Sequence, residues 1–145
     1  MALPKPVQGL VIRYSYLWRS EHLRGQEGGV KNRPCAVILV TRQENGDEIV
    51  TVLPITHSPP AHRLYAVEIP QTTKQRLGLD FERSWVMLSE ANRFIWPGPD
   101  LRPLRNDDIA SVAFGQLPYN LIEEIRLKFI AHLKAHRVKP VSRTE

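Results

Sequence analysis

The chain of 145 residues contains one cysteine, Cys35, so no disulfide bond can form within it. A single thiol is typical of proteins that work in a reducing compartment, and we expect a cytoplasmic location. Cys35 lies inside the apolar run CAVILV, which favours burial of the thiol over a catalytic role.

Long hydrophobic segments are also missing. No apolar run approaches the roughly 20 residues of a membrane-spanning helix, so we expect no membrane association. The opening residues MALPKPVQG lack the apolar core of a signal peptide. The sequence shows no internal repeats, and residues 1–145 are predicted to form one domain, with a loose lead-in over 1–8 and a frayed tail over 138–145.

Acidic residues are outnumbered: Asp and Glu total 15 against 20 Lys and Arg, a net charge of +5 with neutral histidines. This excess favours phosphate-bearing partners through long-range attraction, without identifying one. The glycine-rich stretch GQEGG is not followed by a lysine and a hydroxyl residue in the required spacing, which excludes a phosphate-binding loop of the nucleotide-hydrolase type.

Residues 28–60 contain the most informative pattern in the chain. Two apolar runs rich in β-branched residues, Cys35–Val40 and Ile49–Ile55, are predicted to be strands. Asn45-Gly46 lies between them, and both residue types tolerate the positive φ of a tight hairpin turn. In such a hairpin the start of the first strand lies beside the end of the second.

The same hairpin predicts a cluster of polar side chains at the end away from its turn. Arg33 precedes the first strand, and Thr56 and His57 follow the second. A fixed cation beside a hydroxyl and an imidazole is suited to binding an anion. The sequence therefore predicts an anion site formed by these three residues.

Several short segments outside the hairpin predict a mainly β fold of the α+β class. Turn residues such as Pro59-Pro60 and Pro97-Gly98-Pro99 separate them. Short helices are predicted over Pro70–Gly78, opened by Thr72 or Thr73, and after Asn106 as the cap. Further strands are predicted over Gly9–Trp18, Leu64–Ile69, Trp85–Leu88 and Arg93–Trp96.

The C-terminal segment shows the clearest helical pattern. Asn120 and Glu123 form an N-x-x-E arrangement similar to a capping box, and Pro140 ends the segment. His132 and His136 stand four residues apart, but without a third ligand they predict no metal site. Apolar residues with helical spacing predict one buried face: Leu121, Ile122, Ile125, Phe129, Ile130 and Leu133.

The polar loop from Arg19 to Arg33 is rich in cations and glycines. It is interpreted either as a solvated connection or as an arm that closes over a polyanion, because loops on a rigid scaffold often carry function. The candidate contacts to a nucleic-acid backbone are Arg19, Arg24, Lys31 and, from a later strand, Arg93. The aromatic residues before the loop are interpreted as packing residues, with base stacking as the alternative: Tyr14, Tyr16 and Trp18.

One family resemblance follows from these motifs. A strand opened by Arg33-Pro34, then a strand ending Pro54-Ile55-Thr56, resembles the PemK/MazF family of plasmid-maintenance toxins. The segments Gly9–Trp18 and Ser84–Phe94 are similar to that family's first strand and later core strand. The resemblance covers most of the chain in the order of its elements.

The resemblance implies a small, strongly bent SH3-like barrel with a packed C-terminal helix. It also implies a metal-independent endoribonuclease that needs no cofactor, acts as a homodimer on RNA, and is silenced by an antitoxin, for which we expect an acidic tail. In this class of reaction the RNA 2′-hydroxyl attacks the adjacent phosphorus. The enzyme removes a proton, stabilises phosphoryl charge and protonates the leaving oxygen.

The family's catalytic arginine and threonine correspond to Arg33 and Thr56. An arginine side chain can pair with two phosphate oxygens, and a threonine hydroxyl can donate to a nonbridging oxygen. His57 is the candidate for proton transfer, because the reference pKa of imidazole is about 6.5. The family's acidic-amide pair is replaced by Ser89 and Glu90, which is expected to alter RNA sequence preference.

Two alternatives from other functional classes remain at this point. A gyrase-poison toxin can occupy a similar barrel, but such toxins act through an aromatic C-terminus, and the tail VKPVSRTE has no aromatic residue. A binding or regulatory module can keep the barrel without cleaving RNA.

Overall fold

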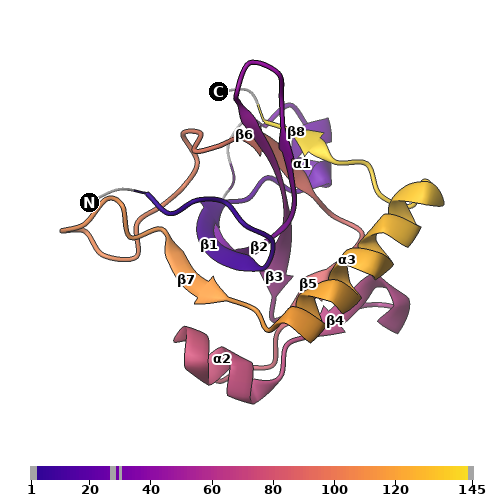
Figure 1. Cartoon of the computed structure of the whole chain (residues 1–145). Helices are drawn as coiled ribbons and strands as arrows, with labels where there is room; N and C mark the ends of the chain where they lie inside the picture. Colours follow the sequence, from indigo (N-terminus) through magenta and orange to yellow (C-terminus); the bar gives the residue numbers. More distant parts are fainter. Residues whose placement is uncertain (1–2, 27–28, 30, 144–145) are drawn as a thin grey trace.

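The computed structural model describes residues 3–26, 29 and 31–143, and within them the chain forms one curled sheet with three α-helices (Figure 1). The sheet order is β4-β5-β3-β2-β1-β7, with β6 pairing β3 and β8. None of the helices in the described residues is long and apolar enough to cross a membrane. The elements are β1 Leu10–Ser15, α1 Arg19–Leu23, β2 Asn32–Arg42, β3 Glu48–Thr56, a 3-10 turn Arg63–Tyr65, β4 Ala66–Glu68, α2 Gln71–Leu77, β5 Trp85–Met87, β6 Asn92–Ile95, β7 Ala113–Gln116, α3 Tyr119–Lys134 and β8 Val141–Ser142.

The predicted hairpin is confirmed as β2 and β3. The two strands pair antiparallel from Arg42 with Glu48 to Cys35 with Pro54, and Gly46 in the turn has a φ of 93°. Both faces of this hairpin are buried, because alternate residues enter two separate apolar clusters. Burial on both faces explains why the two strands show continuous apolar runs instead of alternation.

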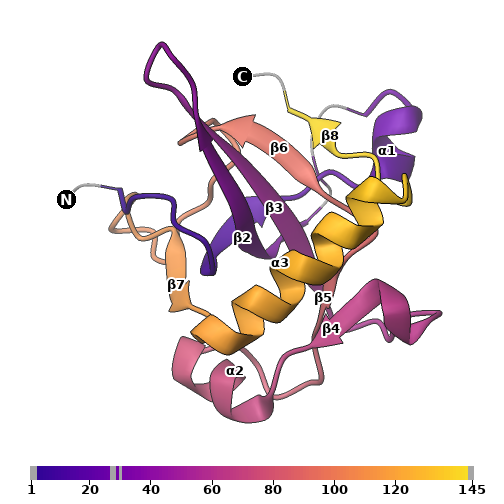
Figure 2. The ribbon, with the colours of Figure 1, turned by 45° about the vertical axis from the view of Figure 1, so that its right-hand side comes forward.

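Strand β3 also bends the sheet. The edge of β3 that faces away from β2 pairs with β6 along Ile49–Val52 and then with β5 at Ile55 and Thr56. The two short strands β6 and β5 therefore pair with successive parts of β3. The result is a curled, half-barrel sheet of antiparallel strands, apart from the short parallel pair β6–β8. Figure 2 shows α3 lying across the hairpin strands on one side of this sheet.

The C-terminal helix is confirmed, but its predicted cap is not. The helix begins at Tyr119 after Pro118, so Asn120 lies inside the first turn instead of capping it. Proline is well suited to the start of a helix, since the missing N–H would have no partner there. The residues of α3 that the sheet and neighbouring loops bury are Ile122, Ile125, Phe129 and His132.

Three smaller expectations differ from the structure. The segment predicted as a strand from Leu64 begins with the 3-10 turn, because the His62 ring accepts a hydrogen bond from the Leu64 N–H. Helix α2 follows Pro70, not a threonine cap. No helix forms after Asn106: Asp108 instead accepts hydrogen bonds from Arg105 and Ala110 and holds a series of turns.

The expected burial of Cys35 is confirmed, since its side chain is fully buried. Removal from water raises the pKa of this thiol far above its ordinary value, so the reactive thiolate is strongly disfavoured. Cys35 is therefore a packing residue of β2.

The expectation of a frayed tail over 138–145 is wrong for residues 138–143. Val138 and Val141 are buried, and β8 pairs with β6. Arg143 is buried as well: its Nη1 donates to the Ser15 carbonyl at 2.8 Å, and its Nη2 lies 3.1 Å from a carboxylate oxygen of Asp100. A polar tail residue is held in the interior because its charge and donors find partners there.

We expect Arg143→Ala to lower the free energy of unfolding by roughly 3 kcal/mol, because it leaves a buried carbonyl without its donor and removes the nearer of the two cations at Asp100. Urea denaturation followed by circular dichroism measures this. Arg105→Ala is the matched control, since the Arg105 side chain itself is 65 % exposed and its loss should cost less than about 1 kcal/mol. Equal, small losses in both variants would contradict the structural role of the tail.

Candidate functional site

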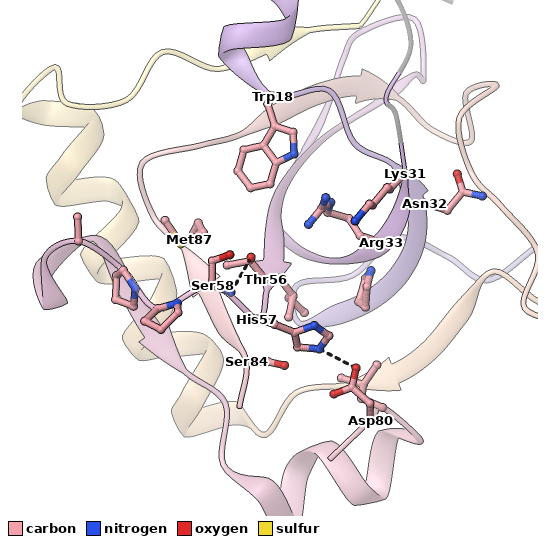
Figure 3. A pocket seen from close by; sticks show the side chains of 16 residues that line it. Trp18, Lys31, Asn32, Arg33, Thr56, His57, Ser58, Asp80, Ser84 and Met87 are labelled. Atoms are coloured by element: carbon pink, nitrogen blue, oxygen red, sulfur yellow. Dashed lines mark hydrogen bonds and ion pairs between the residues drawn. The ribbon is translucent and has the colours of Figure 1, made fainter. Parts of the chain in front are cut away.

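A cavity of about 690 Å³ lies at the end of the β2–β3 hairpin away from the turn. Figure 3 shows Trp18 entering it from one side, Lys31 and Arg33 from another, and His57 pointing toward Asp80 at the opposite end. The predicted residues Arg33, Thr56 and His57 therefore line one cavity together. Its lining residues are Trp18, Lys31, Asn32, Arg33, Pro34, Ile55, Thr56, His57, Ser58, Pro59, Pro60, Ala61, Leu79, Asp80, Ser84 and Met87.

Arg33 is a half-buried cation without a protein anion among the described residues. Its Nε atom is buried and has no hydrogen-bond partner there. The guanidinium instead lies over the ring of Trp18, 5.0 Å from the ring centroid. A guanidinium held against an aromatic ring keeps its N–H groups available for an anion, and a buried donor without a partner is otherwise costly.

Trp18 is held in position from two directions. The Glu21 carboxylate accepts a hydrogen bond from the Trp18 backbone N–H at 3.0 Å, which ties the residue to the start of α1. The Tyr16 ring contacts the indole edge-on, with a centroid distance of 5.2 Å. Trp18 is thus a packed platform for the Arg33 guanidinium, with part of its surface facing the cavity.

Thr56 ends β3 and is held by the sheet, since it pairs with Trp85 of β5. Its hydroxyl oxygen accepts a hydrogen bond from the Ser58 N–H at 3.1 Å. The hydroxyl proton is not used in that bond, so it can be donated to a bound anion.

His57 is held between two carboxylates. Its Nε2 lies 2.6 Å from Asp80, and its Nδ1 lies 3.6 Å from Glu82, a distance too long for a good hydrogen bond. The ring is half exposed. A contact this short favours the tautomer in which Nε2–H donates to Asp80 and Nδ1 carries no proton.

Asp80 is the anion that organises this end of the cavity. Partial burial by itself raises its pKa, but the Lys74 ammonium and the His57 ring together hold the pKa below its ordinary value. Lys74 Nζ lies 2.7 Å from Asp80 Oδ1, and the lysine side chain is buried. Asp80 is therefore a carboxylate that stays ionised throughout the neutral range.

His57, Asp80 and Glu82 offer ligand atoms within 4.8 Å of one another, which is the spacing of a possible metal site. The chemistry does not favour one. Each carboxylate lies beside a different nitrogen of the same ring, and the Asp80 oxygen not used by His57 contacts the Lys74 ammonium. A cation at this position would have to compete with that ammonium. The His132–His136 pair is separated: His132 is buried with its Nε2 on the Leu64 carbonyl, and His136 is exposed.

The cavity does not bring together all the predicted RNA contacts. Lys31 lines it, whereas Arg19, Arg24 and Arg93 are not among its lining residues. Arg93 lies on β6, and Arg24 follows α1, both exposed. These three remain predictions for a wider surface.

Glu90 and Asn92, which lie between β5 and the start of β6, are tied into the fold. Glu90 Oε1 accepts hydrogen bonds from the Tyr16 hydroxyl and the Arg19 N–H, both at 3.1 Å. Asn92 is fully buried, accepts from Leu17 N–H and donates to the Leu17 carbonyl. Both side chains hold the segment that carries Trp18.

Sequence reasoning missed Asp80, which lines the cavity, and Lys74, which binds Asp80 from behind. Asp80 is far from His57 in the chain, and no motif marks it. Lys74 sits in a seven-residue helix, where a lysine is ordinarily exposed, yet its side chain is buried. The two prolines that follow Ser58, Pro59-Pro60, also line the cavity, but in the sequence they indicated only a turn.

None of the protein-family models, curated proteins or solved structures compared with this chain matches it.

We expect Glu90→Gln to keep or raise the melting temperature at pH 7. Burial raises the Glu90 pKa, so ionisation of this side chain is disfavoured in the fold, and glutamine keeps the accepting oxygen without the charge. A carboxyl whose folded pKa is raised contributes stability below its unfolded pKa, which is lost as pH rises through the folded value. The advantage of the variant should therefore shrink as pH falls toward 4.

Thermal denaturation from pH 4 to pH 8 measures this difference. Glu90→Ala should destabilise at every pH because it removes the acceptor of two hydrogen bonds. Glu44→Gln, in the exposed hairpin turn, is the control and should leave stability unchanged. A Glu90→Gln variant as unstable as Glu90→Ala would show that the charge itself is required.

Proposed function

We propose that this protein is a toxin-like, metal-independent endoribonuclease that cleaves single-stranded RNA by attack of the 2′-hydroxyl on the adjacent phosphorus. One observation carries the proposal. The half-buried Arg33 guanidinium has no protein anion among the described residues, and it lines the same cavity as Thr56 and His57. A phosphate oxygen is the anion that completes such a site.

The three residues divide the chemistry between them. His57 Nδ1 accepts the proton of the 2′-hydroxyl as the oxygen–phosphorus bond forms. Arg33 and Thr56 stabilise the charge that gathers on the nonbridging oxygens. The bond to the 5′-oxygen then breaks, and that oxygen takes a proton from the imidazolium or from water. The products are a 2′,3′-cyclic phosphate and a 5′-hydroxyl.

The remaining features of the proposal concern the substrate and the partners. Trp18 faces the cavity and can stack on a nucleobase next to the scissile phosphate, which requires an unpaired strand. The curled sheet with its packed C-terminal helix supports an SH3-like barrel. We propose a homodimer in the cytoplasm, silenced by an antitoxin whose acidic tail neutralises Arg33 and Lys31.

Arg33→Ala should leave the fold intact and lower RNA cleavage by roughly 10²–10³, the usual loss on removing one oxyanion donor. Arg33→Lys should restore little activity, since an ammonium lacks the planar fork. Thr56→Ser should be mild and Thr56→Val severe, because only serine keeps the hydroxyl. His57→Ala should flatten the rise of kcat with pH that a general base produces.

Cleavage is measured on a fluorescent single-stranded RNA with EDTA present, and circular dichroism checks that each variant folds. The matched control is Arg83→Ala, because Arg83 pairs with Glu68 on the surface and is not a lining residue of the cavity. A folded Arg33→Ala variant that cleaves at the wild-type rate would remove the proposed site. RNA binding without any cleavage by the wild-type protein would favour the binding module instead.

We expect RNA affinity to fall steeply with salt, because basic side chains displace counterions from phosphates. Fluorescence anisotropy at several salt concentrations gives the slope of log affinity against log salt. Lys31→Ala should reduce that slope by about 0.7, the value for one phosphate contact on a single strand. Lys128→Ala on α3, where the lysine pairs with Glu124, should leave it unchanged. An affinity that does not depend on salt would contradict the electrostatic part of the proposal.

A further inference from the structure

The most unusual charged group in the protein is the ammonium of Lys74. The side chain is 1 % exposed, although burial of an ammonium costs several kcal/mol unless its charge and donors are satisfied. An ammonium has three N–H donors, and Lys74 has three acceptors. They are Asp80 Oδ1 at 2.7 Å, Ser84 Oγ at 2.7 Å and the Glu82 carbonyl oxygen.

All three acceptors belong to one short segment, residues 80–84. Helix α2 ends at Leu77 and is capped by Gly78, whose φ of 74° is in the left-handed region, so the chain turns back there. The Leu79 N–H then bonds to the Lys74 carbonyl. The segment is therefore shaped around the ammonium, which determines where its carboxylates lie.

The two carboxylates of this segment, Asp80 and Glu82, face the two ring nitrogens of His57. Asp80 Oδ1 accepts from Lys74 and also from the Glu82 N–H at 3.1 Å, so the carboxylate cannot rotate freely. Its other oxygen, Oδ2, lies 2.6 Å from His57 Nε2. A fixed carboxylate on one ring nitrogen sets both the orientation and the tautomer of an imidazole.

We propose that Lys74 and Asp80 are positioning residues that hold His57 as its Nε2–H tautomer, with Nδ1 left to accept the proton of the RNA 2′-hydroxyl. The catalytic meaning of this arrangement rests on the proposed ribonuclease function. The arrangement itself does not, because the tautomer of His57 is a property of the free protein.

The first measurement is ¹⁵N NMR of the His57 ring in the full-length protein without RNA, under conditions where the ring is neutral. The wild-type protein should show Nε2 protonated and Nδ1 unprotonated. In Asp80→Asn the amide places a donor against Nε2, so the proton should move to Nδ1. Lys74→Met frees the Asp80 carboxylate and should give a mixture of tautomers.

Lys128→Met is the matched control, because its partner Glu124 lies on the exposed side of α3, far in sequence from the 80–84 segment. It should leave the His57 signals unchanged. Backbone amide spectra show whether Lys74→Met keeps its fold. If it does not, Asp80→Asn carries the test, since the Asp80 side chain is half exposed and an asparagine oxygen can still accept from the Lys74 ammonium.

The second measurement is cleavage kinetics. Lys74→Met should lower kcat by about 10–100-fold with KM little changed, as is typical when a residue that orients a catalytic group is lost. The double variant with Asp80→Asn should be no slower than Asp80→Asn alone, because both changes act through the same ring.

The two proposals fail in different ways. A folded Asp80→Asn variant whose His57 tautomer matches the wild type would overturn the positioning role, whatever the activity. The expected tautomer change in a wild-type protein that does not cleave RNA would support the positioning role and reject the ribonuclease function. Additive losses in the double variant would show that Lys74 does not act through Asp80.

Discussion

The structure depends on the pairing of β2 with β3. These two strands lie inside the sheet, and each pairs on both edges, so β1, β5 and β6 are positioned by them. Both faces of the pair are buried in apolar clusters. A rigid strand pair of this kind places the side chains at its open end with little freedom, and Arg33 and Thr56 lie there.

Two basic groups in and beside the cavity differ in how the protein pairs them: Arg33 lines the cavity, and Lys74 lies behind its wall, bonded to Asp80 and Ser84. Lys74 is buried, and its three donors all have protein acceptors, so its charge is fully neutralised. Arg33 is half buried over Trp18, and its Nε has no partner among the described residues. The Lys74 ammonium fixes the position of the 80–84 segment, whereas the Arg33 guanidinium keeps N–H groups that a bound anion could accept from. This contrast is the physical basis for treating Lys74 as a structural residue and for proposing Arg33 as a ligand-binding one.

The segment that carries Trp18 is fixed by polar residues far along the chain. Tyr16 bonds to Glu90, and Leu17 bonds to Asn92, which also accepts from Arg143. Burial makes each of these polar groups costly unless it is paired. The cavity wall therefore depends on the β6 region and on the C-terminal tail, although neither lines the cavity.

The sequence by itself determined the local elements: the Asn45-Gly46 hairpin, the short strands and the C-terminal helix. It also brought Arg33 to the same end as Thr56 and His57, because an antiparallel register follows directly from the position of the turn. These predictions succeed because β-branched runs, turn residues and helical spacing act over a few residues.

Only the tertiary structure decided which polar groups pair across long stretches of chain. Lys74 in a short helix, Asp80 in a loop and Arg143 in an apparent tail follow ordinary surface patterns in the sequence, yet each has its partners in the folded protein. Their burial or pairing depends on how the sheet curls and where the chain turns back at Gly78. A charged side chain can be buried only where complementary groups meet it, and no local pattern specifies that meeting.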